Sequence, residues 1–75
     1  MMCESNVYLK KGNKEELLLE NVVLIIPQKN GIIHLSSILG VEKEIKAEIQ
    51  NIDLLNHKVV LRKIEGTDSF INERR

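Results

Sequence analysis

Apolar and polar residues alternate along most of this chain in short runs, which is the pattern of half-buried β-strands. Polar turns separate the runs, and one of them contains an Asn30-Gly31 pair of the kind that closes hairpins. No amphipathic helix of useful length is indicated, although Ser37–Gly40 is compatible with one short helical turn. We therefore predict an all-β protein, a small antiparallel β-barrel or sandwich of about six short strands. The expected strands are Val7–Lys10, Glu15–Leu19, Val22–Ile26, Ile32–Ser36, Lys43–Leu54 and Val59–Ile64.

The longest of these runs changes phase along its length. Apolar residues occupy odd positions from Ile45 and even positions from Ile52 onward. Successive side chains of a strand point to opposite faces, so an unbroken strand would turn one of the two sets outward. We predict a β-bulge near Gln50-Asn51 that keeps both sets facing inward.

Two runs, Leu17–Leu19 and Val22–Ile26, are apolar on both faces. The interior of a barrel accepts only one face of each strand, and a two-fold symmetric partner is the commonest way to cover the other. We therefore expect a homodimer with Leu18, Val23 and Ile25, or their opposite-phase neighbours, at the interface.

The composition excludes several classes of function. Eleven basic and eleven acidic residues cancel, which argues against a nucleic-acid-binding surface. Tyr8 and Phe70 are the only aromatic residues, so bases have almost nothing to stack on. The sequence holds no glycine-rich phosphate loop, no nucleophile elbow and no convergent set of nucleophile, base and orienting group, and we predict that the protein is not an enzyme.

Cys3 is the candidate for chemistry. It is the single cysteine of the chain, which favours a reducing, cytoplasmic setting. No apolar run approaches the roughly 18 to 20 residues that cross a bilayer, so we expect no membrane partner. A thiolate is a soft ligand suited to nickel, copper or zinc, and the polar residues after Cys3 offer a thiol little apolar burial. His34 in a strand and His57 in a turn are better explained by structural roles, and Glu4 by solvation.

The opening Met2-Cys3-Glu4-Ser5-Asn6-Val7-Tyr8-Leu9 resembles the CooT-type family of small nickel-binding accessory proteins of carbon monoxide dehydrogenase maturation. Two later stretches, Glu16–Val22 and Asp53–Leu61, agree with it in order and spacing, so the resemblance spans roughly residues 2 to 64. An additional Met1 precedes the family-like start, and the residues after about Glu65 are an extension relative to the family.

The resemblance implies a homodimer that holds nickel(II) through Cys3 of both chains and serves carbon monoxide dehydrogenase. Other soft divalent metals such as zinc are possible cargo. A single chain is an alternative, because the amine, two amides and the thiolate of Met1–Cys3 could wrap one metal ion. We expect residues 1–65 to form the metal-binding β-barrel domain and residues 66–75 a mobile polar tail. A small-barrel RNA-binding or protein-interaction module is the alternative function.

Overall fold

The computed structural model describes residues 4–64 and, through the backbone alone, residues 70–72. Nearly all of these residues lie in strands, which confirms the predicted all-β class, and the short helix is a 3-10 turn. The elements follow one another as β1 (Ser5–Lys11), β2 (Lys14–Pro27), η1 (Lys29–Gly31), β3 (Ile32–Ser37), β4 (Glu42–Asp53), β5 (Lys58–Lys63) and β6 (Phe70–Asn72).

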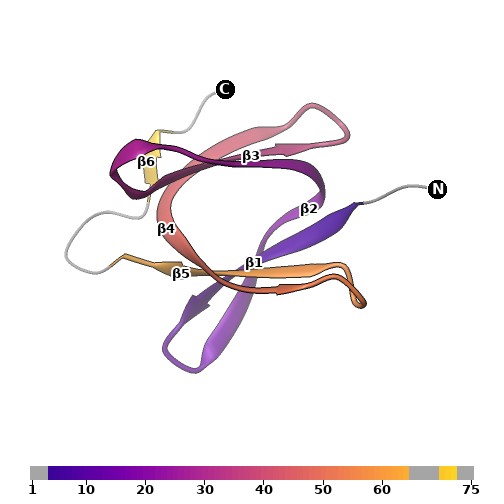
Figure 1. The fold of residues 1–75 in the computed structure, drawn as a ribbon, viewed down its shortest axis with the longest axis horizontal. Helices are drawn as coiled ribbons and strands as arrows, with labels where there is room; N and C mark the ends of the chain where they lie inside the picture. Colours follow the sequence, from indigo (N-terminus) through magenta and orange to yellow (C-terminus); the bar gives the residue numbers. More distant parts are fainter. Residues whose placement is uncertain (1–3, 65–69, 73–75) are drawn as a thin grey trace.

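Five strands close into a small barrel in the order β3-β2-β1-β5-β4, and the pairing of β3 with β4 completes the ring (Figure 1). All neighbouring strands run antiparallel except β1 and β5, which are parallel. The long strands β2 and β4 each serve two neighbours in succession. The first half of β2 pairs with β1 and the second half with β3, while β4 pairs first with β3 and then with β5.

The strand β2 unites two runs that the sequence analysis separated at Glu20-Asn21. The polar pair indicated a break, but the backbone stays extended through it from Lys14 to Pro27. Asn21 has a positive φ of 56°, a conformation that asparagine tolerates better than most residues. The polar pair therefore marks a kink in one strand, and the register with β1 is irregular opposite it, between Ser5 and Val7.

The core fills the interior of the ring with side chains from all five of its strands. Alternate residues of β1, β3 and the first half of β4 point inward, as the period of two predicts. The buried cluster consists of Val7, Leu9, Val22, Ile33, Leu35, Ile45, Ala47, Val59 and Leu61. Leu18, Leu19 and Ile25 pack against this cluster and are half-buried.

The predicted bulge in β4 is confirmed, because the register between β4 and β5 shifts between Ile49 and Asn51. Its predicted consequence is wrong. Ile52 remains half exposed, and Leu54 points away from the core with 78% of its surface accessible. The reason is that β4 ends at Asp53, so the apolar residues beyond the bulge lie at the rim of the barrel and in the following turn.

The turns differ from expectation in one respect. The 3-10 turn lies at Lys29–Gly31, in the connection of β2 to β3, where Asn30 and Gly31 both have positive φ. The residues Ser37–Gly40 instead form a hydrogen-bonded turn, in which the N–H of Gly40 donates to the carbonyl of Ser37 at 3.0 Å. The helical turn predicted there is therefore absent from this part of the described chain.

The C-terminal segment contributes one strand that the sequence analysis did not predict. The backbone of β6 pairs antiparallel with β4, with Phe70 opposite Ile45 and Asn72 opposite Glu44. Along β4, the pairing with β6 follows the pairing with β5, which ends where Lys63 lies opposite Ala47. The remaining residues of the predicted tail, 66–69 and 73–75, lie outside the described residues, and its mobility stays a prediction.

Candidate metal centre

The predicted metal ligand, Cys3, lies outside the described residues, and Glu4 is the first residue that the structure places. Glu4 is half-buried, and β1 begins immediately after it at Ser5, which pairs with Val22 of β2. The candidate thiol is therefore covalently joined, through one residue, to a strand in the middle of the sheet.

Asn6 fixes the start of β1 through two hydrogen bonds. Its backbone N–H donates to the carbonyl of His57 at 2.9 Å, and its side-chain Oδ1 accepts from the N–H of Asn21 at 3.2 Å. The carbonyl of Asn21 in turn accepts from the N–H of Ile38 at 2.8 Å. A continuous chain of hydrogen bonds therefore links the beginning of β1 to the β4–β5 turn on one side and to the β3–β4 turn on the other.

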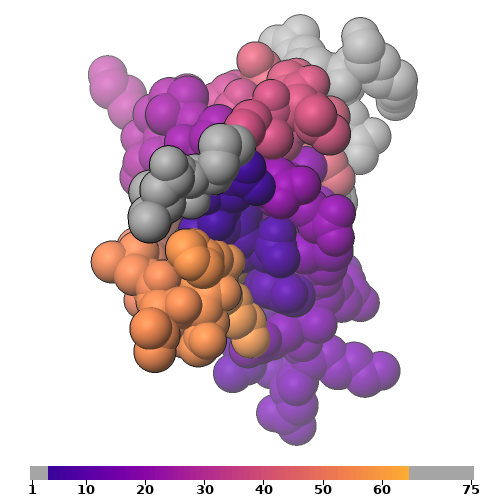
Figure 2. Space-filling view, turned by 90° about the vertical axis from the view of Figure 1, so that its right-hand side faces the viewer, coloured from indigo at the N-terminus to yellow at the C-terminus, as the bar shows by residue number. Residues whose placement is uncertain are grey.

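These two turns lie at the end of the barrel where the described chain begins (Figure 2). Both present leucines to solvent: Leu39 in the β3–β4 turn is 82% exposed, and Leu55 in the β4–β5 turn is 87% exposed. Leu54, beside Leu55, is also exposed. Large apolar side chains gathered at one end of a small protein are typical of a surface that contacts another molecule.

The sequence analysis did not identify Asn6 and Asn21 as the residues that anchor this end. The available signal was the polar Glu20-Asn21 pair inside an apolar stretch, which was interpreted as a break between two strands. The partner of Asn21 lies fifteen residues away in the sequence, and nothing local indicates that contact.

His57 comes close to the start of β1 through its backbone. It has a positive φ of 53° and an exposed side chain in the β4–β5 turn, as expected for a turn residue. Its carbonyl is the group that accepts from Asn6. The turn itself is held by Asp53, whose two carboxylate oxygens accept from the backbone N–H of Asn56 at 3.1 Å and its side-chain amide at 2.8 Å. These hydrogen bonds lower the pKa of Asp53 below its ordinary value of 3.8.

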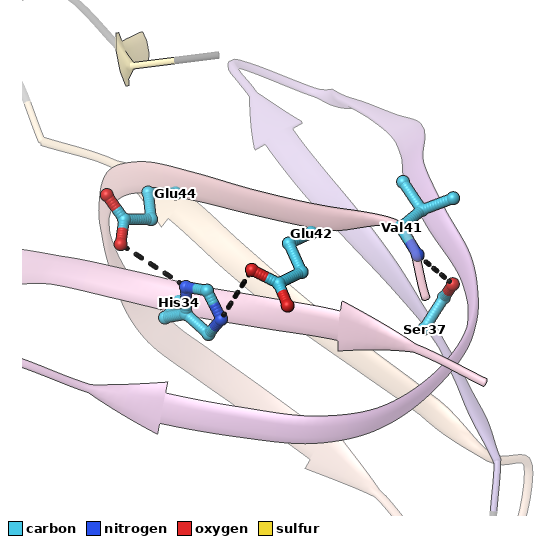
Figure 3. A network of polar contacts seen from close by, with 5 residues as sticks. All are labelled: His34, Ser37, Val41, Glu42 and Glu44. Atoms are coloured by element: carbon cyan, nitrogen blue, oxygen red, sulfur yellow. Dashed lines mark hydrogen bonds and ion pairs between the residues drawn. The ribbon is translucent and has the colours of Figure 1, made fainter. Parts of the chain in front are cut away.

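His34 lies on the outer face of the barrel between two carboxylates of β4 (Figure 3). Its Nδ1 is 3.3 Å from Oε2 of Glu44, and its Nε2 is 3.7 Å from Oε1 of Glu42. The two ring nitrogens point to different carboxylates, so the three side chains do not converge on one point. His34 therefore joins β3 to β4 through polar contacts with these carboxylates, in agreement with the structural role predicted for it.

Within the part of the chain that the structure describes, no group of three or more His, Cys, Asp or Glu side chains is arranged to hold a metal ion. Two of the acidic residues on the exposed face of β4 pair across strands. Glu48 pairs with Arg62 of β5, and Glu44 with His34. These residues have structural roles in holding neighbouring strands together, so Cys3 stays the candidate ligand.

Lys58 connects the β1–β2 hairpin to β5. Its ammonium lies 2.8 Å from Oε1 of Glu15 and 5.0 Å from the centre of the Tyr8 ring. The hydrogen bond between the two charged groups lowers the pKa of Glu15 and raises the pKa of Lys58. Tyr8, the one aromatic side chain that the structure places, thus makes a cation–π contact with Lys58.

No helix among the described residues has the length and apolar character required to cross a membrane.

Comparison with known proteins identifies the family. The model of CooT, the CO dehydrogenase accessory protein, matches residues 2–62, a range that includes Cys3 and leaves out Met1 and the C-terminal segment. A crystal structure described as CooT from Carboxydothermus hydrogenoformans superposes with a TM-score of 0.78 at 38% sequence identity, covering 84% of this chain and 100% of the other. No curated protein matches the chain. CooT proteins are accessory proteins and not catalysts. This chain, a five-stranded barrel with the family's sequence over residues 2–62, belongs to the CooT family of CO dehydrogenase accessory proteins.

Proposed function

We propose that this protein binds nickel(II) through the Cys3 thiolates of two chains in a cytoplasmic homodimer and supplies the metal to carbon monoxide dehydrogenase. The observation that carries the proposal is the family match, which begins at residue 2 and so includes the single cysteine. The lack of another ligand cluster among the described residues supports the choice of Cys3.

Two thiolates provide half of a four-coordinate site, and backbone or terminal nitrogens are suitable for the other half. Nickel(II) favours square-planar surroundings of this kind, and thiolates also bind zinc well. The ligands must be deprotonated, so binding releases protons and weakens as the pH falls. Nickel is cargo in this proposal, so the site must also be able to release it.

The proposed dimer requires the beginnings of two chains to meet. The β4–β5 turn is the apolar element bonded directly to the start of β1, and its Leu54 and Leu55 are exposed. A two-fold axis beside this turn would cover both leucines and bring the two Cys3 residues together. Of the interface residues predicted from the sequence, Leu18 and Ile25 pack against the core. Val23 and the opposite-phase neighbours Leu17, Leu24 and Ile26 are each about half exposed, and they form a second candidate interface.

Calorimetric titration of the full chain with nickel chloride under reducing conditions tests the proposal. We expect one nickel per two chains. The single-chain alternative predicts one nickel per chain. Cys3→Ala should abolish tight binding, whereas His34→Ala and His57→Ala, as matched controls, should bind like the wild type. Undiminished binding by Cys3→Ala would refute the proposal.

A second measurement separates the dimer from the metal site. Light scattering at tens of micromolar protein should give the mass of a dimer for the wild type and of a monomer for Leu54→Glu/Leu55→Glu. A wild-type monomer that still binds one nickel per chain would favour the single-chain site. Transfer to the target is tested by adding the nickel-loaded protein to nickel-free carbon monoxide dehydrogenase and following the gain of activity.

A further inference from the structure

The first half of β2 is an open edge of the barrel. Residues Lys14–Val22 pair with β1 on one side, and the pairing with β3 on the other side begins only at Val22. Among residues 4–64 and 70–72, no strand pairs with the second side of β2 before that point. The long bent strand therefore leaves the second side of residues 14–21 available for another strand.

An apolar groove runs along this edge. It is lined by Leu17–Asn21 of β2 on one side and by Ser37, Leu39 and Val41 on the other. Leu17 and Val41 are each about half exposed, and Leu39 is almost fully so. Figure 2 shows the corresponding part of β2 beside the β3–β4 turn.

The far wall of the groove is held in a fixed shape. The Oγ of Ser37, a buried residue, accepts from the N–H of Leu39 at 3.2 Å and from the N–H of Val41 at 3.1 Å. The N–H of Ile38 also donates to the carbonyl of Asn21, which ties this wall to β2 at one end of the groove. The groove is thus a formed surface between two elements.

A side chain already satisfies one backbone group of the open edge. The ammonium of Lys43 donates to the carbonyl of Leu18 at 3.2 Å. In a complete sheet this carbonyl would accept from the N–H of a neighbouring strand. Lysine is common at sheet edges, where it discourages unwanted pairing and can swing aside because its stem is flexible.

Two acidic residues lie at the groove. Glu20 lines it and is exposed, and Glu42 follows Val41 of the far wall. Glu16, before Leu17, is already paired with Lys11 at 3.4 Å between Oε1 and Nζ. The carboxylate of Glu42 remains more than half exposed although it lies near His34. A ligand strand with basic residues at its ends would therefore be attracted to this edge, and an acidic one repelled.

We propose that the open edge of β2 binds an extended segment of a partner protein by strand addition, with apolar side chains in the groove and basic residues facing Glu20 and Glu42. The open edge offers backbone N–H and carbonyl groups, and an extended strand is the ligand that can pair with them. The acidic rim determines its charge. A second copy of this chain fits less well, because its β2 would bring a second Glu20 to the same acidic edge.

Fluorescence anisotropy with the full chain and a labelled peptide Arg-Val-Thr-Val-Thr-Val-Arg tests this proposal. We expect saturable binding that weakens with added salt. The matched control is the same peptide with alternate backbone amides methylated, which cannot donate to a strand edge and should not bind. A peptide with glutamate in place of both arginines should bind at least about tenfold more weakly.

Variants locate the site. Leu17→Asp and Glu20→Lys should each weaken binding at least about fivefold, whereas Gln50→Asp, at an exposed position of β4, should leave it unchanged. Amide chemical shifts of the wild type should change on peptide addition along residues 17–21, a readout that does not depend on any variant folding. Equal binding of the methylated peptide, or shift changes confined to other strands, would overturn the proposal. A wild-type dimer that becomes a monomer in Leu17→Asp would also overturn it, because a second copy of the chain would then occupy the groove. None of these outcomes depends on nickel.

Discussion

The side chain of Asn6 accepts a hydrogen bond from the backbone N–H of Asn21, at 3.2 Å between Oδ1 and N. The bond lies where the register of β1 and β2 is irregular, between Ser5 and Val7, so a side chain replaces a bond of the ladder. It also holds Asn21 in its left-handed conformation, with φ at 56°. The beginning of β1, next to the candidate nickel ligand, is thus fixed by side-chain as well as backbone contacts.

Asn6→Ala should lower the stability of the protein and loosen the start of β1. Loss of the acceptor leaves the N–H of Asn21 without this partner, at a cost of about 1 to 2 kcal/mol. Urea unfolding measures the change, and amide hydrogen exchange should accelerate at Asn21. Gln50→Ala, at an exposed position of β4, is the control and should lie within about 0.5 kcal/mol of the wild type. Equal exchange at Asn21 in Asn6→Ala and the wild type would contradict this role.

Truncation of Ile45 tests the assignment of the core. Ile45 is completely buried in the ring, so Ile45→Ala should destabilise the protein by about 2 to 5 kcal/mol through lost burial and a residual cavity. In a barrel of this size that is a large part of the total stability. Val23→Ala removes a half-exposed side chain from β2 and should cost less than about 1 kcal/mol. Similar midpoints of urea unfolding for the two variants would show that the core is assigned incorrectly.

The glycine at position 31 is favoured by its backbone conformation and lies close to one side chain. Its φ is +75°, and an added Cβ would lie 2.7 Å from Cδ1 of Ile64. Cδ1 is the far end of a side chain that can turn aside, so Gly31→Ala should cost the roughly 1 to 2 kcal/mol of left-handed strain plus a small term for moving Ile64. Gly12→Ala is the matched control, because Gly12 has a φ of +60° with no atom near the added Cβ. Thermal melting should place Gly31→Ala below Gly12→Ala, and the reverse order would exclude a role for the contact with Ile64.

The ion pair of Glu15 and Lys58 predicts a dependence of stability on pH. The pKa of Glu15 lies below its ordinary value of 4.5, so its contribution is present above that pH and is lost as the pH falls through the lowered pKa. The pKa of Lys58 lies above 10.5, so its contribution is complete below that value and is lost as the pH rises through the raised pKa. Both side chains are about a third exposed, and solvent keeps the effect small.

Melting curves of the wild type and Glu15→Gln test this pair. The wild type should melt at a higher temperature throughout the window between about pH 5 and about pH 10, and the two proteins should converge at more acidic pH. Glu20→Gln, at an exposed position of the same strand, serves as the control for a simple change of net charge. A difference between the wild type and Glu15→Gln that persists below about pH 3 would rule out the ion pair as its cause.

Local patterns in the sequence predicted much of the fold. The period of two identified the strands, the change of phase after Ile49 located the bulge in β4, and Asn30-Gly31 indicated the β2–β3 turn. The patterns did not predict the continuity of β2, because Asn21 adopts a conformation that depends on a contact with Asn6. The parallel pairing of β1 with β5 could not be predicted either, because strand order depends on contacts between residues far apart in the sequence.

The candidate site was predictable only through composition and the family resemblance. A single cysteine near a strand indicated a metal ligand, and the family match supports an accessory role in maturation. The groove beside β2 was not predicted, because Leu17 and Val41 form it only after the barrel closes. The same closure places Leu18 and Ile25 against the core, which a strand pattern with two apolar faces does not distinguish from an interface.

Truncation after Glu65 tests whether the barrel depends on its last strand. The ring of β1 to β5 is closed by the pairing of β3 with β4, and β6 adds only a three-residue ladder to β4. We expect the shortened protein to keep its fold, its dimer and its nickel binding, with a loss of about 1 to 2 kcal/mol from the missing backbone pairs. Urea unfolding and nickel titration of both proteins provide the comparison, and replacement of residues 66–75 by a glycine-serine segment of equal length controls for chain length. A shortened protein that unfolds several kcal/mol more easily would show that β6 is an integral part of the barrel. Lost nickel binding with unchanged stability would instead assign the C-terminal segment to the metal site.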